Sequence, residues 1–181
     1  AFSDAIGANP NGWANPPDAT CCDASPGVET HFESSRFFFL DTLGEYREIM
    51  DRNDATETAI WVTSFGWGTS ENVLVLPDNN SVFLTYTSPE EQAVYIPRAY
   101  EIAEELGFVG PMILNNLNAC AAGIPESCYY SLIDATNAAR PAFGTIQAMP
   151  KGDASPMPSP SPTEMISPSA TAILPATATP Q

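Results

Sequence analysis

The sequence predicts an α/β fold with a parallel sheet, because three short apolar segments alternate with three segments of helical periodicity. Apolar runs of about four to eight residues bounded by Gly, Pro or Asn are typical of buried strands. Strands that alternate with helices pair in parallel through crossover connections, and the chain has few hairpin turn signals. In such a sheet, functional residues are expected in the loops that follow the strands.

The first strand and helix lie in the N-terminal third. Residues 2–8 (FSDAIGA) are a short apolar run, and the turn-rich segment NPNGWANPPD ends it. This segment leads into a long loop with two adjacent cysteines. A helix follows, with Asp41 or Thr42 as the expected N-cap. Its apolar residues recur at helical spacing: Leu40, Leu43, Tyr46, Ile49 and Met50.

The second strand is predicted over residues 59–65, which are apolar and rich in β-branched side chains. A run of this kind is typical of a strand that is buried on both faces, so Trp61 is expected in the core. Residues 72–87 are irregular and predict a long loop.

The second helix has unusually clear signals at both ends. Ser88 is a capping residue followed by Pro and two glutamates, all of which favour a helix start. The helix is expected to run to about Leu106, with Gly107 as its stop. Pro97 lies inside it and predicts a kink, because proline removes one backbone hydrogen bond.

The third strand and helix complete the pattern. Residues 110–118 predict a strand that runs into a loop, residues 129–134 predict a brief extended piece, and residues 139–151 predict a closing helix. Cys120 and Cys128 flank the short segment AAGIPES in this loop, and a disulfide between them is the favoured pairing. The chain has four cysteines, so three connectivities are possible, and the partners of Cys21 and Cys22 stay open.

The chain is predicted to have two parts, a folded domain over residues 1–151 and a tail over residues 152–181. The tail is rich in Pro, Ser and Thr, and such a segment buries too little surface to fold. It is expected to be a disordered stalk, open to O-glycosylation, or a plain linker. An even number of cysteines without zinc-site spacing and with few lysines favours an oxidising compartment, so an extracellular or cell-surface location is expected.

Composition excludes several classes of partner. The formal net charge is −16, which repels phosphate backbones, so nucleic acid is not an expected partner. No apolar run has the length of a membrane span, which is about 20 residues. The sequence predicts no metal site and no cofactor.

Four segments, taken together, resemble the last three strand and helix units of clan A (β/α)8-barrel glycoside hydrolases. WVTSFGWGTSEN is similar to their seventh-strand motif W-V-T-E-F-G-W, and DAIGANPNGWANPPD to a sixth-strand pattern D-x-x-G-x-H-P-Y-G. GFVGPMILNNLN is similar to an eighth strand G-P-M-x-x-W-N-L-N, and RPAFGTIQAMPK to the final helix. The resemblance covers residues 1–151, whereas a complete barrel needs about 250 residues. It therefore implies a partial (β/α)8 (TIM) barrel of about three parallel units.

The resemblance also implies that this chain has lost the catalytic groups of the family. The nucleophilic glutamate position falls on Ser64, and the acid/base glutamate belongs to a fourth-strand unit for which this chain has no counterpart. Asn9, Asn11 and Asn115 stand where the family patterns have His, Tyr and a sugar-facing Trp. A hydrolytic triad of Ser64 with His31, the only histidine, is not favoured, because there is no G-x-S-x-G elbow and a solvent-facing loop histidine is expected.

We therefore expect a degenerate glycoside-hydrolase-like, carbohydrate-related protein that is inactive alone and that retains glycan binding. Two alternatives stay open: a fragment or subunit of an active O-glycosyl hydrolase, and a structural protein that self-associates through its open sheet edges. A missing N-terminal barrel portion would be the partner in the first alternative. Aromatic rings at Trp13 and Tyr129 could stack on sugars or pack in loops. The predicted substrate-binding residues are Asn9, Asn11, Trp67, Asn115, Asn116 and Asn118.

Overall fold

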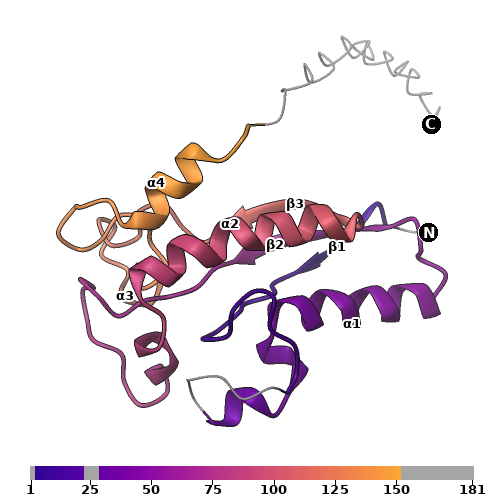
Figure 1. Ribbon diagram of the computed structural model, residues 1–181, viewed down its shortest axis with the longest axis horizontal. Coiled ribbons are helices and arrows are strands. Elements are labelled where there is room, and N and C mark those ends of the chain that lie inside the picture. Colours follow the sequence, from indigo (N-terminus) through magenta and orange to yellow (C-terminus); the bar gives the residue numbers. More distant parts are fainter. Residues whose placement is uncertain (1–2, 23–28, 152–181) are drawn as a thin grey trace, which may run out of the picture. The chain divides into compact units, whose positions relative to one another are not determined.

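A three-stranded parallel sheet lies at the centre of the protein in a computed structural model that describes residues 3–22 and 29–151 (Figure 1). The strands are β1 (Ala5–Ala8), β2 (Ala59–Phe65) and β3 (Val109–Leu114), and β2 lies between the other two. Both pairings are parallel, with Ile60 beside Ile6 on one side and beside Val109 on the other. The predicted parallel α/β fold is thus confirmed, and three such units are compatible with part of a (β/α)8 barrel.

Helices connect and follow the strands. The α-helices are α1 (Phe39–Arg52), α2 (Pro89–Leu106), α3 (Pro125–Cys128) and α4 (Pro141–Ala148). Three short 3-10 helices lie in the loops: η1 (Glu29–Phe32), η2 (Ser35–Phe37) and η3 (Val82–Thr85). In the described ranges, none of the helices combines the length and the apolar character of a membrane span. The predicted tail, residues 152–181, lies outside the described residues.

Helix α2 begins and ends where the sequence predicts. The Ser88 hydroxyl accepts a hydrogen bond from the Glu91 backbone N–H at 3.1 Å, and the Glu91 carboxylate accepts one from the Ser88 N–H at 2.8 Å. This reciprocal pair is a capping box, which satisfies two N–H groups at the helix start. Gly107 ends the helix at φ 68°, a left-handed conformation that glycine adopts at little cost. The helix continues through Pro97.

Helix α1 begins earlier than the sequence predicts. Its N-cap is Phe38, and Asp41 and Thr42 both lie inside the helix, so the predicted cap was wrong. Phe38 has no side-chain capping group, but the Phe38 and Phe39 side chains are fully buried. Burial of two aromatic rings stabilises the fold by more than the ~1 kcal/mol of a typical cap. Tertiary packing therefore decides where this helix starts.

The helices cover one face of the sheet. Ile60 and Val62 of β2 are fully buried in a core that also contains Leu43 of α1 and Ile96 of α2. Ala8, Phe65 and Trp67 belong to the same core cluster. This face is the interior of the molecule.

The opposite face of the sheet is uncovered, which corrects the prediction that β2 is buried on both faces. Trp61 is 49% exposed and Ile113 is 59% exposed. A Cβ on Gly7 would contact the Thr63 side chain, and one on Gly110 would contact the Trp61 ring, so these residues share a face. We call this the open face, and its residues are Gly7, Trp61, Thr63, Gly110 and Ile113. Trp61 is therefore not a core residue, because none of the helices in residues 3–22 and 29–151 covers its side of the sheet.

Candidate functional site at the C-terminal edge of the sheet

The carboxyl ends of the three strands meet at one edge of the sheet. Asn9 follows β1, Ser64 is the penultimate residue of β2, and Asn115 follows β3. The Asn115 N–H donates to the Phe65 carbonyl at 2.9 Å, so the β2 and β3 ends are held side by side. Because parallel strands place their loops at the same edge, this is where a ligand site is expected. We call it the C-terminal edge.

Ser64 lies where the strand pairing is irregular. The β2–β3 register shifts between Val62 and Phe65, and Ser64 is partly buried between these two core residues. Its hydroxyl makes no hydrogen bond to any side chain that the structure describes. A serine hydroxyl is a weak nucleophile unless a neighbouring base removes its proton. The described geometry gives Ser64 no such base.

Asn9 and Thr63 form a polar pair beside Ser64. The Thr63 hydroxyl donates to the Asn9 side-chain oxygen at 2.7 Å. This bond engages the side-chain oxygen of Asn9. Because Asn9 is exposed, its side-chain NH2 group can donate a hydrogen bond toward solvent. Asn11 is partly buried in the loop beyond.

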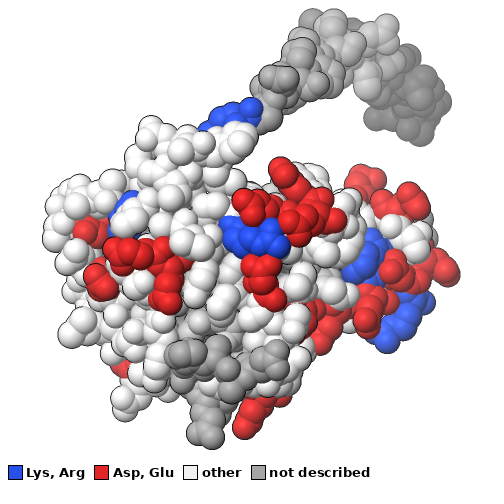
Figure 2. Space-filling model, viewed as in Figure 1, with Lys and Arg blue, Asp and Glu red and all other residues white. Residues whose placement is uncertain are grey.

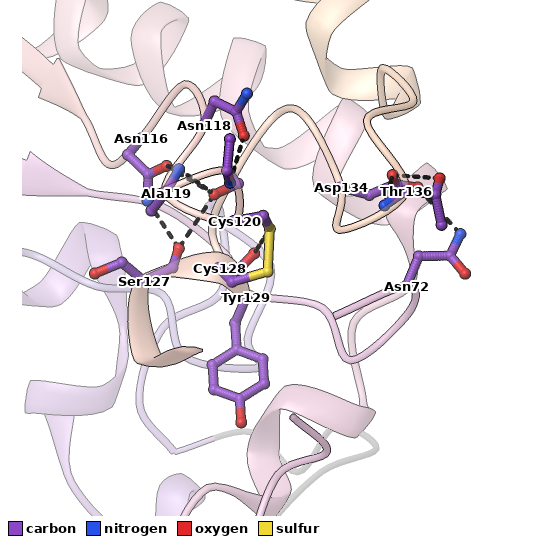
Figure 3. The surroundings of a disulfide bond; sticks show 12 residues. Asn72, Asn116, Asn118, Ala119, Cys120, Ser127, Cys128, Tyr129, Asp134 and Thr136 are labelled. Atoms are coloured by element: carbon purple, nitrogen blue, oxygen red, sulfur yellow. Dashed lines mark hydrogen bonds between the residues drawn. A yellow bond between two sulfur atoms is a disulfide. The ribbon is translucent and has the colours of Figure 1, made fainter. Parts of the chain in front are cut away.

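Asn116 and Asn118 organise the loop after β3 (Figure 3). The Asn116 side chain donates to the Ser127 carbonyl at 2.8 Å and accepts from the Ser131 hydroxyl at 2.8 Å. The Asn118 side chain accepts from the Ala121 N–H at 3.1 Å. Bonds of both residues therefore hold their own loop in shape, whereas the sequence assigned them to substrate contacts.

A disulfide closes the same loop. Cys120 and Cys128 are bonded, with their Cα atoms 4.4 Å apart, as the sequence predicts. Both residues are buried, and the bond lies beside Asn116 and Asn118 in Figure 3. The adjacent Cys21 and Cys22 are paired with one another, which is the connectivity that the sequence left open. The loop after β3 is thus held by a covalent bond as well as by amide hydrogen bonds.

Trp67 packs inside the molecule rather than at its surface. Its side chain is fully buried, and its ring N–H donates to the Asn15 carbonyl at 2.7 Å. The buried Gln92 side chain donates to the Trp67 carbonyl at 2.7 Å. The ring therefore has no exposed surface on which a sugar could stack in this structure, although the sequence placed it among the substrate contacts.

A cluster of aromatic rings in the loops, the loop aromatic cluster, was not predicted from the sequence. Its members are Trp13, His31, Phe37 and Phe83. The His31 ring stacks on Phe37 with 4.1 Å between ring centres, and the ring centres of Trp13 and Phe83 lie 5.1 and 5.5 Å from that of His31. Burial lowers the pKa of His31 below its ordinary value, and the nearby charge of Arg36 lowers it further. His31 is partly buried against these rings, whereas a fully solvent-facing residue was expected. Long loops bring these rings together, and no sequence periodicity signals such contacts.

Three of the arginine side chains are bound by partners within the chain. The Arg98 guanidinium contacts Asp18 and Glu105, each at 2.7 Å. Arg47 donates to the Ala55 and Thr58 carbonyls, and the buried Arg140 donates to the Tyr129 and Glu71 carbonyls. The face in Figure 2 carries many more acidic than basic side chains. No group of His, Cys, Asp and Glu suited to hold a metal ion occurs among the described residues.

No protein-family model and no curated protein matches this chain. One solved structure that it resembles is a family 39 glycoside hydrolase from the gut symbiont Bacteroides cellulosilyticus WH2. The two chains are 18% identical, with a TM-score of 0.47. The match covers 78% of this chain and 26% of that chain, so this chain spans about a quarter of that protein's length.

Proposed function

We propose that this chain is a carbohydrate-related, glycoside-hydrolase-like domain that binds uncharged glycans at the C-terminal edge and does not hydrolyse them by itself. One observation carries the proposal. Asn9, Ser64 and Asn115 lie at or just beyond the carboxyl ends of the three strands, where Asn9 accepts a hydrogen bond from Thr63 and the Asn115 side-chain oxygen accepts one from Asn116. These groups pair with sugar hydroxyls, but they cannot carry out the chemistry of a glycosidase.

This chain lacks the groups that glycoside hydrolysis requires. A retaining glycosidase needs two carboxyl groups about 5 to 5.5 Å apart, one as nucleophile and one as acid/base. Ser64 has no carboxylate and no hydrogen-bonded base within the described residues, so it can neither attack the sugar nor balance the positive charge of the transition state. The motif similarity that places Ser64 at the nucleophile position therefore also predicts loss of activity.

The charge of the chain favours an uncharged ligand. The chain has six Lys and Arg residues against twenty-two Asp and Glu, and three of the arginines already bind internal carboxylates or carbonyls. A uronic acid or sulfated sugar would approach a strongly negative protein with little positive charge to meet it. Neutral hexose or pentose chains meet no such barrier.

Hydrolysis is tested with aryl β-glycosides, using the wild-type chain and Ser64→Glu. Neither is expected to turn over substrate, because a single carboxylate lacks its proton-donating partner. Turnover by the wild-type chain would contradict the proposed inactivity. Turnover by Ser64→Glu alone would mean that this chain carries its own acid/base group, which would favour the active-hydrolase alternative.

Binding is tested by calorimetric titration with neutral oligosaccharides and, at the same ionic strength, with oligogalacturonate. Asn9→Ala is expected to weaken neutral binding roughly fivefold, the effect of one lost hydrogen bond of about 1 kcal/mol. Gln147→Ala removes an exposed amide from α4 and is the matched control. Absence of binding to any sugar at millimolar concentration would refute the glycan role.

A further inference from the structure

We propose that copies of this chain assemble edge to edge, with β3 of one copy pairing in parallel with β1 of the next, so that their open faces turn inward and cover one another. This goes beyond the proposed glycan role, and it assigns an occupant to the open face. The occupant is a second copy of the same chain.

The open face is the first observation behind the proposal. Parallel sheets are ordinarily covered on both faces, but the helices that the structure describes cover only one face of this sheet. On the other face, Trp61 and Ile113 expose 49% and 59% of their surfaces. Gly7 and Gly110 lie beside Thr63 and Trp61, so the indole stands next to positions without side chains. A partner that covers this face would therefore pack beside Trp61 and Ile113 and fill the space above the two glycines.

The sheet edges are the second observation. In the described part of the chain, β1 and β3 each pair with β2 alone, so one side of each strand has backbone groups without a strand partner. None of the three strands contains a charged residue, although the chain carries a net charge of −16. Charged residues normally protect an edge from pairing with another chain. Pro111 removes one N–H from β3 and leaves the remaining donors.

The size of the open face decides between two ways of joining copies. From the spacing of strands and residues, the face covers about 300 Å² in projection. A stable interface needs about 800 Å² from each partner, so stacking two open faces would be too small by itself. Edge-to-edge pairing adds a hydrogen-bonded ladder and brings the helices of neighbouring copies together.

Parallel pairing of β3 with β1 of the next copy also gives both edge strands a second partner strand. The contact joins two different surfaces, so it repeats from copy to copy and ends only when a ring closes. A closed sheet has no edges, and its inward face is filled by side chains when about eight strands are present. Two copies of this three-stranded sheet have six strands and three copies have nine, so the two strand numbers lie on either side of eight. The C-terminal edges of all copies would then surround one shared mouth.

The assembly is tested by size-exclusion chromatography with light scattering. The wild-type chain is expected at two or three times its monomer mass of 19.3 kDa. Ile113→Lys places a charge in the centre of the open face and should give a monomer. Val94→Lys is the matched control, because Val94 is 65% exposed on α2, the helix that follows the central strand, and this variant should keep the assembled mass. Circular dichroism checks that both variants fold, and Trp61→Lys is a second variant on the same face.

Hydrogen exchange tests the geometry of pairing. In the assembled protein the amides of β1 and β3 that point away from β2 should be protected, and Ile113→Lys should reduce that protection while the amides bonded between β2 and its neighbours stay protected. A wild-type chain that is monomeric up to about 100 µM overturns the proposal. An assembly that survives Ile113→Lys and Trp61→Lys overturns it as well, and so does one that leaves the outward-pointing amides of β1 and β3 unprotected, because the copies would then meet through another surface.

Discussion

The two faces of the sheet differ in burial although the same strands form both. On the helix-covered face, Ile60 and Val62 are fully buried against α1 and α2. On the open face, Trp61, which lies between them in sequence, is 49% exposed. Alternation of side chains along a strand makes the contrast possible. The difference teaches that one face holds the domain together, whereas the other is available for contacts between molecules.

The largest expected effect comes from the covered face. Ile60→Ala should lower the free energy of unfolding by about 2–5 kcal/mol, because it removes buried methyl groups and leaves a cavity. The measurement is urea denaturation followed by circular dichroism, under conditions where the protein is monomeric. If Ile60→Ala cost no more than a surface substitution, the helix-covered face would not be the core.

The next effect tests how far the covered core extends beyond the sheet. A Cβ at Gly12 would overlap the buried Trp67 ring, so Gly12→Ala should destabilise the fold by about 1–3 kcal/mol. Gly44→Ala is the control, because nothing lies near that position and alanine favours the interior of α1 by about 0.5–1 kcal/mol. Thermal melts of the two variants should therefore shift in opposite directions. A shift in the same direction would mean that the loop around Gly12 does not pack on the core as described.

A smaller effect concerns the loop aromatic cluster around His31. Its contribution to the stability of the fold should depend on pH. The folded pKa of His31 is lowered, so its neutral form is favoured in the fold, and the stability that it contributes is present above the unfolded pKa of about 6.5. That stability should be lost as the pH falls below 6.5 toward the folded pKa. His31 is the only histidine, so His31→Phe should remove this pH dependence. Melting temperatures between pH 7.5 and 5 measure it, and equal slopes for both proteins would contradict the prediction.

The smallest effect belongs to the open face. Trp61→Ala should change the stability of the monomer by less than about 1 kcal/mol, because about half of the side chain is already in water. Comparison with Ile60→Ala in the same denaturation experiment makes the contrast between the faces quantitative. A loss comparable to that of Ile60→Ala would mean that Trp61 is covered within a single molecule.

Local chemistry in the sequence predicted several elements closely. Strand β2 has the predicted bounds, and α2 begins at its capping box and ends at Gly107. The Cys120–Cys128 pairing also follows from local spacing. These features depend on groups a few residues apart, so neighbouring residues suffice to predict them.

The two tryptophans of the WVTSFGW segment show where such reasoning fails. The sequence placed Trp61 in the core and Trp67 at the ligand site, but Trp67 is fully buried and Trp61 is exposed. An apolar run cannot reveal whether a second layer covers its other face. Nor can it reveal that the loop around Gly12 folds over Trp67, because these residues are far apart in the sequence. The other proposed sugar contacts, Asn9, Asn11 and Asn115, stay predictions.

The sequence by itself determined the alternation of strands and helices, the ends of α2 and the presence of serine at position 64. All of these depend on residue identity and on short-range hydrogen bonding. Only the tertiary structure decided which face of β2 is covered, where α1 starts and which aromatic rings surround His31. These features depend on burial between distant segments, and burial is a property of the folded chain as a whole.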